Sequence, residues 1–304
     1  MKNTKLVFGL LVSVIVFNFS ACDVIEGDYM TSGIITPTDT NAFTKKVLIE
    51  DFTGHRCPNC PAAANELQAL QDVYGDKVIG IAIHPHSNFS VPNPITSNQY
   101  TYEFRTQAGD NIDDVFEMTD AGLPVGMVNR IGYSSTHQLA KEEWSSVVQT
   151  ELEKDAIFGI TLNSNVINEN GTITVNIETL CDLNETYNLV VCLTENNIIE
   201  WQTDNTAGDI NDYEHNHVLR TILNSTFGET FGNNFTEGDI WEKNYSVNIA
   251  DLENQNEYYS LNTLFMGNGN CKEWIEDNME IVVYVYNTSS YEIVQVEQIH
   301  LINH

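Results

Sequence analysis

The chain has 304 residues, of which 42% are hydrophobic, and a formal net charge of −30 at pH 7. Nucleic acids and anionic lipid surfaces repel so acidic a chain, so we expect no nucleic-acid partner. The apolar content excludes an intrinsically disordered chain, and the length suits two domains of ordinary size.

The start of the chain has the features of a targeting segment. The positive residues Lys2 and Lys5 precede an apolar stretch over residues 6–19 and a small-residue site that ends at Cys22. A transmembrane anchor is one alternative, but the stretch is shorter than the roughly 20 apolar residues that a bilayer requires. A plain secretory signal is another. We predict a lipoprotein signal peptide over residues 1–21 and a lipid on Cys22 that attaches the protein to a membrane.

A tether is predicted to follow the lipid. Residues 22–42 contain glycine, proline and several Thr and Asp residues without sustained periodicity, which is typical of a flexible linker. Asp23, directly after Cys22, is a residue that in some bacteria favours the inner membrane, so this position leaves the choice of membrane open.

A strand, a turn and a helix follow at residues 47–75. The apolar run over residues 47–52 predicts a buried strand that stops at Thr53-Gly54. A helical pattern opens behind Cys60, with apolar residues at steps of three and four, and Gly75 is its expected end. The apolar positions of this helix are Ala63, Leu67, Leu70 and Val73.

Cys57 and Cys60 therefore stand in the turn and at the first turn of the helix, a favourable place for disulfide chemistry. Unpaired N–H groups and the helix dipole stabilise a thiolate there. In thiol–disulfide exchange, Cys57, at the more exposed end, attacks, and Cys60 resolves the mixed disulfide. A zinc site is disfavoured because no second ligand pair lies at suitable spacing, and residue 61 is proline where covalent haem needs histidine.

The order strand, turn, Cys-x-x-Cys and helix resembles the thioredoxin superfamily. Asp51 stands six residues before Cys57, where thioredoxins carry a buried acid, and the resemblance implies that it accepts a proton from Cys60. The whole chain, with its lipoprotein signal, its Gly-His-Arg-Cys-Pro-Asn-Cys-Pro segment and its long β-rich tail, resembles the Omp28-related outer-membrane lipoproteins. This family resemblance implies a thioredoxin-like domain joined to a β-sandwich.

The rest of the first domain extends to residue 155. Residues 77–84 predict a second strand, parallel to the first through a right-handed crossover. Helices are expected over residues 97–108, with Tyr100 and Phe104 on one face, and over residues 110–118. A closing helix is predicted over residues 138–154, with Ser135 or Thr136 as candidate caps.

Leu123-Pro124 stands where thioredoxin-like proteins carry a cis-proline opposite the two cysteines. The alternative is an ordinary trans proline at a strand start. With a cis bond the backbone of Leu123 faces the sulfurs and can pair with an extended substrate. We therefore assign Pro124 to the catalytic site, and Leu123, Arg56 and His55 to the substrate-binding site.

The second half is predicted to be β-rich. Asn170-Gly171 is a hairpin-turn signal, and short apolar runs recur without long helices between them, which suggests an antiparallel sandwich. The expected strands cover residues 158–164, 172–180, 187–194, 197–201, 246–249, 258–265, 280–286 and 291–302. The predicted fold class is an α/β thioredoxin-like domain over residues 43–155, followed by an all-β, immunoglobulin-like sandwich over residues 156–304.

Three further cysteines lie in the second half, namely Cys181, Cys192 and Cys271. An odd count in an exported protein leaves one thiol unpaired. Cys181 with Cys192 is the favoured pair, and the remaining thiol is expected to be buried.

Two histidine motifs are candidates for a metal site. His215 and His217, preceded by Asp209 and Asp212, would share one face of a strand. We favour a hydrogen-bonded loop over a metal site there, and the same for the His84-Pro85-His86 motif. No metal and no cofactor are predicted.

Two hypotheses for function follow. The first is a thiol–disulfide oxidoreductase, lipid-anchored in the cell envelope at the outer membrane, that acts on thiols or disulfides of exported proteins. The second is a surface-binding or adhesin-like lipoprotein with an envelope or surface protein partner, in which the Cys57–Cys60 disulfide is structural. Both place the protein outside the cytoplasm.

Overall fold

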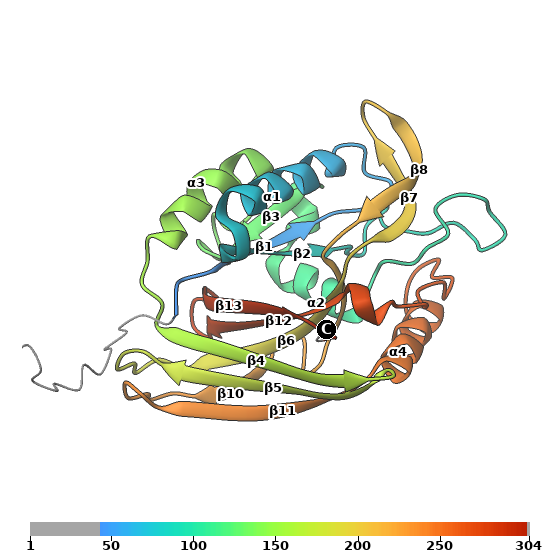
Figure 1. The fold of residues 1–304 in the computed structure, drawn as a ribbon. Coiled ribbons are helices and arrows are strands. Elements are labelled where there is room, and N and C mark those ends of the chain that lie inside the picture. Colours follow the sequence, from blue (N-terminus) through green and yellow to red (C-terminus); the bar gives the residue numbers. More distant parts are fainter. Residues whose placement is uncertain (1–42, 303–304) are drawn as a thin grey trace, which may run out of the picture. The chain divides into compact units, whose positions relative to one another are not determined.

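The computed structural model describes residues 43–302 (Figure 1). The predicted signal peptide over residues 1–21, the lipid on Cys22 and the tether over residues 22–42 lie outside the described residues. Among residues 43–302, no helix combines the length and the apolar character that crossing a membrane requires.

The first half of the described chain is a mixed α/β region. Its main elements are β1 (Val47–Phe52), α1 (Cys60–Tyr74), β2 (Val78–Ile83), α2 (Gln107–Phe116), β3 (Val125–Val128) and α3 (Lys141–Leu152). Short 3₁₀ turns cover Gly75–Lys77 and Met118–Ala121. β2 runs parallel to β1, which confirms the predicted strand–helix–strand unit, and β3 runs antiparallel along the other edge of β1.

The helix behind the cysteines matches its prediction except on one side. α1 ends at Gly75, whose positive φ of 61° costs glycine little. Ala63, Leu67 and Leu70 are buried as predicted, whereas Val73 is 74% exposed. The apolar spacing therefore overestimated the width of the buried face.

Two helix predictions in the first half need correction. Residues 97–106 are not helical, because Tyr100 has a positive φ and α2 begins only after Thr106, whose hydroxyl accepts the N–H of Gly109. The closing helix begins at Lys141, where the Ala140 N–H donates to the Glu143 carboxylate. The predicted caps, Ser135 and Thr136, lie outside that helix.

The second half is dominated by strands. Its elements are β4 (Phe158–Ile167), β5 (Asn170–Thr179), β6 (Tyr187–Glu195), β7 (Ile198–Asp204), β8 (Gly208–His215), β9 (Val218–Ile222), β10 (Glu229–Gly232), β11 (Ile240–Asn248), α4 (Ile249–Asn262), a 3₁₀ turn (Glu276–Asn278), β12 (Met279–Asn287) and β13 (Ile293–His300). The predicted strand over residues 258–265 is wrong, because Asn248 caps a helix there through the N–H of Asp251. The β4–β5 turn is formed by Asn168 and Glu169, both at positive φ, two residues before the predicted Asn170-Gly171.

These strands form antiparallel sheets, as predicted, and also extend the sheet of the first half. The large sheet has the order β13-β12-β6-β9-β2-β1-β3, with β10 beside β6. A second sheet has the order β11-β5-β4, and β7 and β8 pair with each other (Figure 1). The large sheet thus contains strands from both sides of residue 155, and the domain boundary there stays a prediction.

Three apolar clusters hold these layers together. α1 and α3 pack on one face of β1, around Val47, Ile49 and Trp144. Leu48 and Phe52, on the opposite face of β1, pack with α2 and with side chains of β6 and β12. The third cluster lies between the strands β4, β5 and β11 and the strands β6 and β12. All six residues of β1 are therefore buried, on both faces of the strand, which explains its apolar residues Val47–Ile49 and Phe52, and only Glu50 and Asp51 are charged.

A buried ion pair connects β1 with the β-rich half. Arg130 donates to both carboxylate oxygens of Glu50, at 2.7 and 2.6 Å, and to the hydroxyl of Tyr284 in β12, at 2.9 Å. All three side chains are essentially inaccessible. Breaking such a pair leaves an uncompensated charge in the interior, which is strongly unfavourable.

We predict that Arg130→Met lowers the free energy of unfolding by about 3–5 kcal/mol, because it leaves the buried Glu50 carboxylate without a partner charge. Lys141→Met is the control, since its partner Glu142 is exposed and such pairs contribute at most about 1 kcal/mol. Chemical denaturation of the oxidised protein measures both. An equal, small effect of the two changes would contradict the role given to this pair.

Candidate functional site

The two cysteines lie between β1 and α1 and form a disulfide. Cys57 and Cys60 have Cα atoms 5.4 Å apart, and Cys60 is the first residue of α1. α1 has no acidic residue in its first turn, so nothing there offsets the positive end of its dipole. Both cysteines are only 1% exposed, so the prediction that Cys57 is the more exposed of the two is wrong in this conformation.

The hairpin of β7 and β8 lies against this disulfide loop. The N–H groups of Thr203 and Asn205 donate to the carbonyls of His55 and Pro58, both at 2.8 Å. The side-chain amide of Gln202 donates to the carbonyl of Cys57 at 3.0 Å. The sequence did not predict that the second half of the chain covers the disulfide loop, because no local pattern links residues so far apart.

His55 and Arg56, assigned above to substrate binding, have different surroundings. His55 is fully buried between Tyr100 and Phe104, and its Nε2 lies 3.3 Å from the carbonyl of Val91. Burial lowers the pKa of His55 to about 3, so this side chain is neutral at physiological pH. Arg56 is half-buried, with its guanidinium over the ring of Tyr100.

Leu123-Pro124 lies next to the end of β1. The peptide bond between them is cis, as predicted. Val125, which follows, pairs with Phe52, the last residue of β1, so the cis bond stands beside the point where the disulfide loop leaves the sheet. Leu123 and Pro124 are both half-buried.

Asp51 is buried beneath the disulfide loop, as predicted. It is 2% exposed, and its Oδ1 makes no hydrogen bond with any described residue. Burial raises the pKa of Asp51 to about 7. The carboxyl is therefore divided between its two protonation states near neutral pH.

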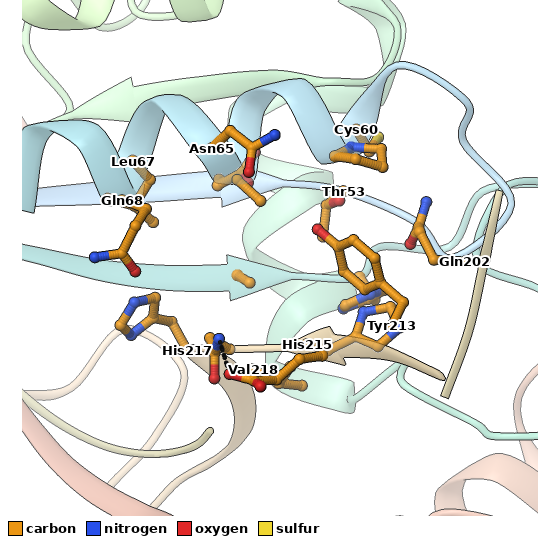
Figure 2. Close-up of a pocket in the computed structure, with 17 residues that line it drawn as sticks. Thr53, Cys60, Asn65, Leu67, Gln68, Gln202, Tyr213, His215, His217 and Val218 are labelled. Carbon is orange, nitrogen blue, oxygen red and sulfur yellow. Dashed lines mark hydrogen bonds between the residues drawn. The ribbon is translucent and has the colours of Figure 1, made fainter. Parts of the chain in front are cut away.

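Asp51 and Cys60 line a cavity of about 150 Å³ between α1, β2 and the end of β8 (Figure 2). The figure shows Tyr213 and His215 on one side of this cavity and α1 with Asn65 and Gln68 on the other. The remaining lining residues include Thr53, His84, Gln202 and His217. Residues from both halves of the chain therefore line the cavity beside the disulfide.

The cavity contains an unusual set of buried histidines. Burial lowers the pKa of His215 to about 3 and that of His217 to about 4, and it lowers the pKa of His84 well below its ordinary value. Neither ring nitrogen of His84 has a hydrogen-bond partner among the described residues, nor has Nε2 of His215. These neutral rings offer donors and acceptors to small polar molecules such as water.

Both histidine motifs are visible in the sequence, but their proximity in space was not predicted. His84 directly follows β2 and His217 directly precedes β9, and the parallel pairing of Ala82 with Val218 brings these two strands together. Gln202 and Tyr213 had no sequence signal at all. Within residues 43–302, no group of three histidine, cysteine or acidic side chains has a geometry that could hold a metal ion.

The other three cysteines among residues 43–302 are all free thiols. The predicted Cys181–Cys192 disulfide is therefore wrong. Cys192 is buried within β6, where burial raises the pKa of its thiol, and the half-exposed Cys181 lies two residues beyond the end of β5. β5 and β6 belong to different sheets, which the alternation of the sequence did not show.

Two solved structures resemble this chain, and the first of them, HBP35, shares its fold. HBP35 of Porphyromonas gingivalis is 16% identical, and the match covers 86% of this chain and 76% of that one with a TM-score of 0.55. A domain of the outer membrane lipoprotein Omp28 from Porphyromonas gingivalis is 18% identical, covering 48% of this chain and 88% of that one with a TM-score of 0.29. A search of curated proteins finds no match.

The fold and the site thus define an α/β protein with a Cys-x-x-Cys disulfide, extended by antiparallel sheets. The model of the family "Outer membrane protein Omp28" matches residues 109–271, more than half of the chain, and the chain belongs to this family. The protein is accordingly extracytoplasmic and associated with the outer membrane.

We predict that Asp51 makes stability depend on pH. Its folded pKa of about 7 lies above the ordinary value of 3.8, so the folded state holds this proton longer than the unfolded state does. The contribution of Asp51 to the free energy of unfolding is greatest below pH 4 and is lost as the pH rises toward 7. Between pH 5 and 8 the wild type should lose about 3 kcal/mol relative to Asp51→Asn.

Denaturant unfolding of both proteins at pH 5 and 8, with the disulfide kept oxidised, measures this difference. Taking the difference between the two proteins removes the contribution of the buried histidines, which are common to both. Parallel pH profiles for wild type and Asp51→Asn would show that the carboxyl has an ordinary pKa.

Proposed function

We propose that the protein catalyses thiol–disulfide exchange on exported proteins at the outer membrane, through Cys57 and Cys60. The observation that carries this proposal is a disulfide at the start of α1 with the buried, partly protonated carboxyl of Asp51 behind it. Buried groups with such perturbed pKa values are typical of sites that transfer protons.

Two finer assignments belong to this proposal. The order β1, α1, β2 and the cis bond before β3 support a thioredoxin-like domain over residues 43–155. The packing of β4, β5 and β11 on β6 and β12 supports an immunoglobulin-like sandwich over residues 156–304. Family membership is also in keeping with a lipid anchor on Cys22.

The reduced pair would act in two steps. The Cys57 thiolate attacks one sulfur of a partner disulfide, and the other sulfur leaves as a thiolate that takes up a proton. Cys60 then gives its proton to the Asp51 carboxylate and attacks the Cys57 sulfur. This step releases the partner's second thiol and restores the Cys57–Cys60 disulfide, so the partner gains two electrons and an envelope dithiol donor must return them.

In this scheme the side chains around the site bind and orient. Leu123 and Pro124, beside the end of β1, are proposed to contact the partner's chain, together with Arg56. The His55 side chain is fully buried, so the substrate-binding role predicted for it is limited to its backbone carbonyl. Asp51 serves as the proton acceptor because its pKa of about 7 allows it to take and return a proton near neutral pH.

We expect Cys60→Ser to accumulate mixed disulfides with exported proteins, because nothing resolves the bond that Cys57 forms. Cys57→Ser should accumulate few. Cells are quenched with acid and alkylated, and the captured proteins are identified from nonreducing gels. The same pair of changes in a Cys181→Ser background controls for the half-exposed thiol, and equal capture by the two variants would refute the roles assigned to Cys57 and Cys60.

A second function, a surface-binding protein with a structural disulfide, is favoured by one observation: both cysteines are 1% exposed. The reduction potential separates the two functions. We expect a value within about −120 to −270 mV, the range of exchange catalysts, whereas a value below about −300 mV would mark a structural bridge. Equilibration with dithiothreitol or glutathione, with Cys181, Cys192 and Cys271 replaced, measures it.

A further inference from the structure

We propose that the backbone carbonyls of residues 54–58 form a binding site for an extended segment of the partner protein, and that β7 occupies this site as a displaceable internal ligand. The inference rests on the proposed function, because it concerns how a partner reaches the disulfide. It adds a site that the cysteines and the cis-proline do not provide.

The end of the β7–β8 hairpin bonds to the loop through its backbone. Thr203, in β7, and Asn205, the first residue of the turn, are two residues apart, and their N–H groups donate to the carbonyls of His55 and Pro58. In an extended chain, alternate N–H groups point to the same side, so an extended partner segment can offer the same two donors. The Gln202 amide adds bonds to the carbonyls of Cys57, at 3.0 Å, and Gly54, at 3.3 Å.

Every carbonyl in these contacts belongs to the loop that carries Cys57. An extended partner segment bound in the same way would lie along that loop and bring a cysteine sulfur toward the disulfide. While β7 is in place, the two sulfurs are closed off, since Cys57 and Cys60 are each 1% exposed. Exchange with a protein partner therefore requires β7 to move.

The hairpin is suited to such movement. Within residues 43–302, β7 and β8 pair only with each other, and a two-stranded sheet is marginally stable by itself. Its turn, residues 205–208, is exposed. At the other end His215 packs on Phe104, with ring centroids 4.6 Å apart, so the base is anchored by packing while the turn end is held by hydrogen bonds.

Tyr100 holds the turn end closed. Its hydroxyl donates to the Asp209 carboxylate at 2.6 Å and lies 2.8 Å from the hydroxyl of Thr203. Tyr100 belongs to the segment before α2, where a helix was predicted and an irregular loop is found. The closed state thus depends on a few identified hydrogen bonds.

The first experiment measures how fast the Cys57–Cys60 disulfide of the full chain is reduced. Gln202→Ala combined with Tyr100→Phe removes the side-chain bonds that hold β7. Reduced thioredoxin should reduce this variant at least about tenfold faster than the wild type, because each lost hydrogen bond contributes about 1 kcal/mol to the closed state. Thr174→Ala, which loses an exposed hydrogen bond to Asn244 on the other sheet, is the control and should leave the rate unchanged.

A second variant keeps the test decisive if the first variant fails to fold. Joining Thr203 to Asp209 through Asn-Gly in place of residues 204–208 removes the Asn205 contact and keeps a two-residue hairpin turn, since Thr203 already pairs with Asp209. We expect faster reduction here too. Rates equal to that of the wild type in both variants, with unfolding transitions intact, would overturn the role of β7 as an internal ligand.

The second experiment tests the row of carbonyls with a cysteine peptide activated as its mixed disulfide with thionitrobenzoate. The Cys57 thiolate of the reduced shortened variant attacks the peptide sulfur and releases coloured thionitrobenzoate, and Cys60 then displaces the peptide thiol. N-methylation of two alternate residues removes two N–H donors from one side of the peptide. One of the two sets of alternate residues has its N–H groups toward the loop. Methylation of that set should slow the release of thionitrobenzoate about tenfold, and methylation of the other set should not.

Equal effects of the two alternations would overturn the binding site. The inference and the proposed function fail in different ways. If the shortened variant is reduced faster but Cys60→Ser captures no exported protein, β7 remains an internal ligand and the proposed function fails. If the wild type captures as many partners as the shortened variant, the inference fails and the proposed function stands.

Discussion

The site depends on one junction, the parallel contact between β2 and β9. The Ala82 N–H donates to the His217 carbonyl at 2.8 Å, and Ala82 with Val218 is the one registered pair of these strands. Through this contact the β-rich half continues the sheet of the first half. It also directs the preceding hairpin over the disulfide loop and brings His215 and His217 to the cavity beside Asp51.

The cavity is costly for the fold and useful for chemistry. A buried carboxyl and buried imidazoles without hydrogen-bond partners reduce stability, because their polar atoms lose water and gain nothing in return. The Asp51 and His84 side chains are such groups. Surrounding structure must offset this cost. The buried carboxylate of Glu50, by contrast, accepts two hydrogen bonds from Arg130.

The burial of the disulfide is compatible with both proposed functions. Burial of both sulfurs suits a structural bridge, and it equally suits an exchange site that opens only to a partner able to displace β7. The difference lies in the hairpin, whose contacts with the loop include two backbone hydrogen bonds of the kind that another extended chain can replace. Access to the sulfurs, rather than their chemistry, then selects the partner.

The sequence by itself determined the local elements. The apolar run of β1, the helix behind Cys60 and the alternation of the β-rich half all follow from patterns within a few residues, whereas the buried position of Asp51 was expected from the resemblance to thioredoxins. Local signals were weaker where tertiary contacts compete with them. Tyr100 and Phe104 have helical spacing, yet they pack on His55 from an irregular loop.

Only the tertiary structure decided what surrounds the disulfide. Gln202 and Thr203 contact the loop at residues 54–58 from about 145 residues further along the chain, and nothing in either segment predicts the other. Likewise Cys181 and Cys192 are close in sequence, but Cys181 follows β5 and Cys192 lies in β6 of the other sheet, so proximity along the chain gave the wrong pairing. Sequence patterns report which face of an element is buried, whereas the sheet order decides which faces meet.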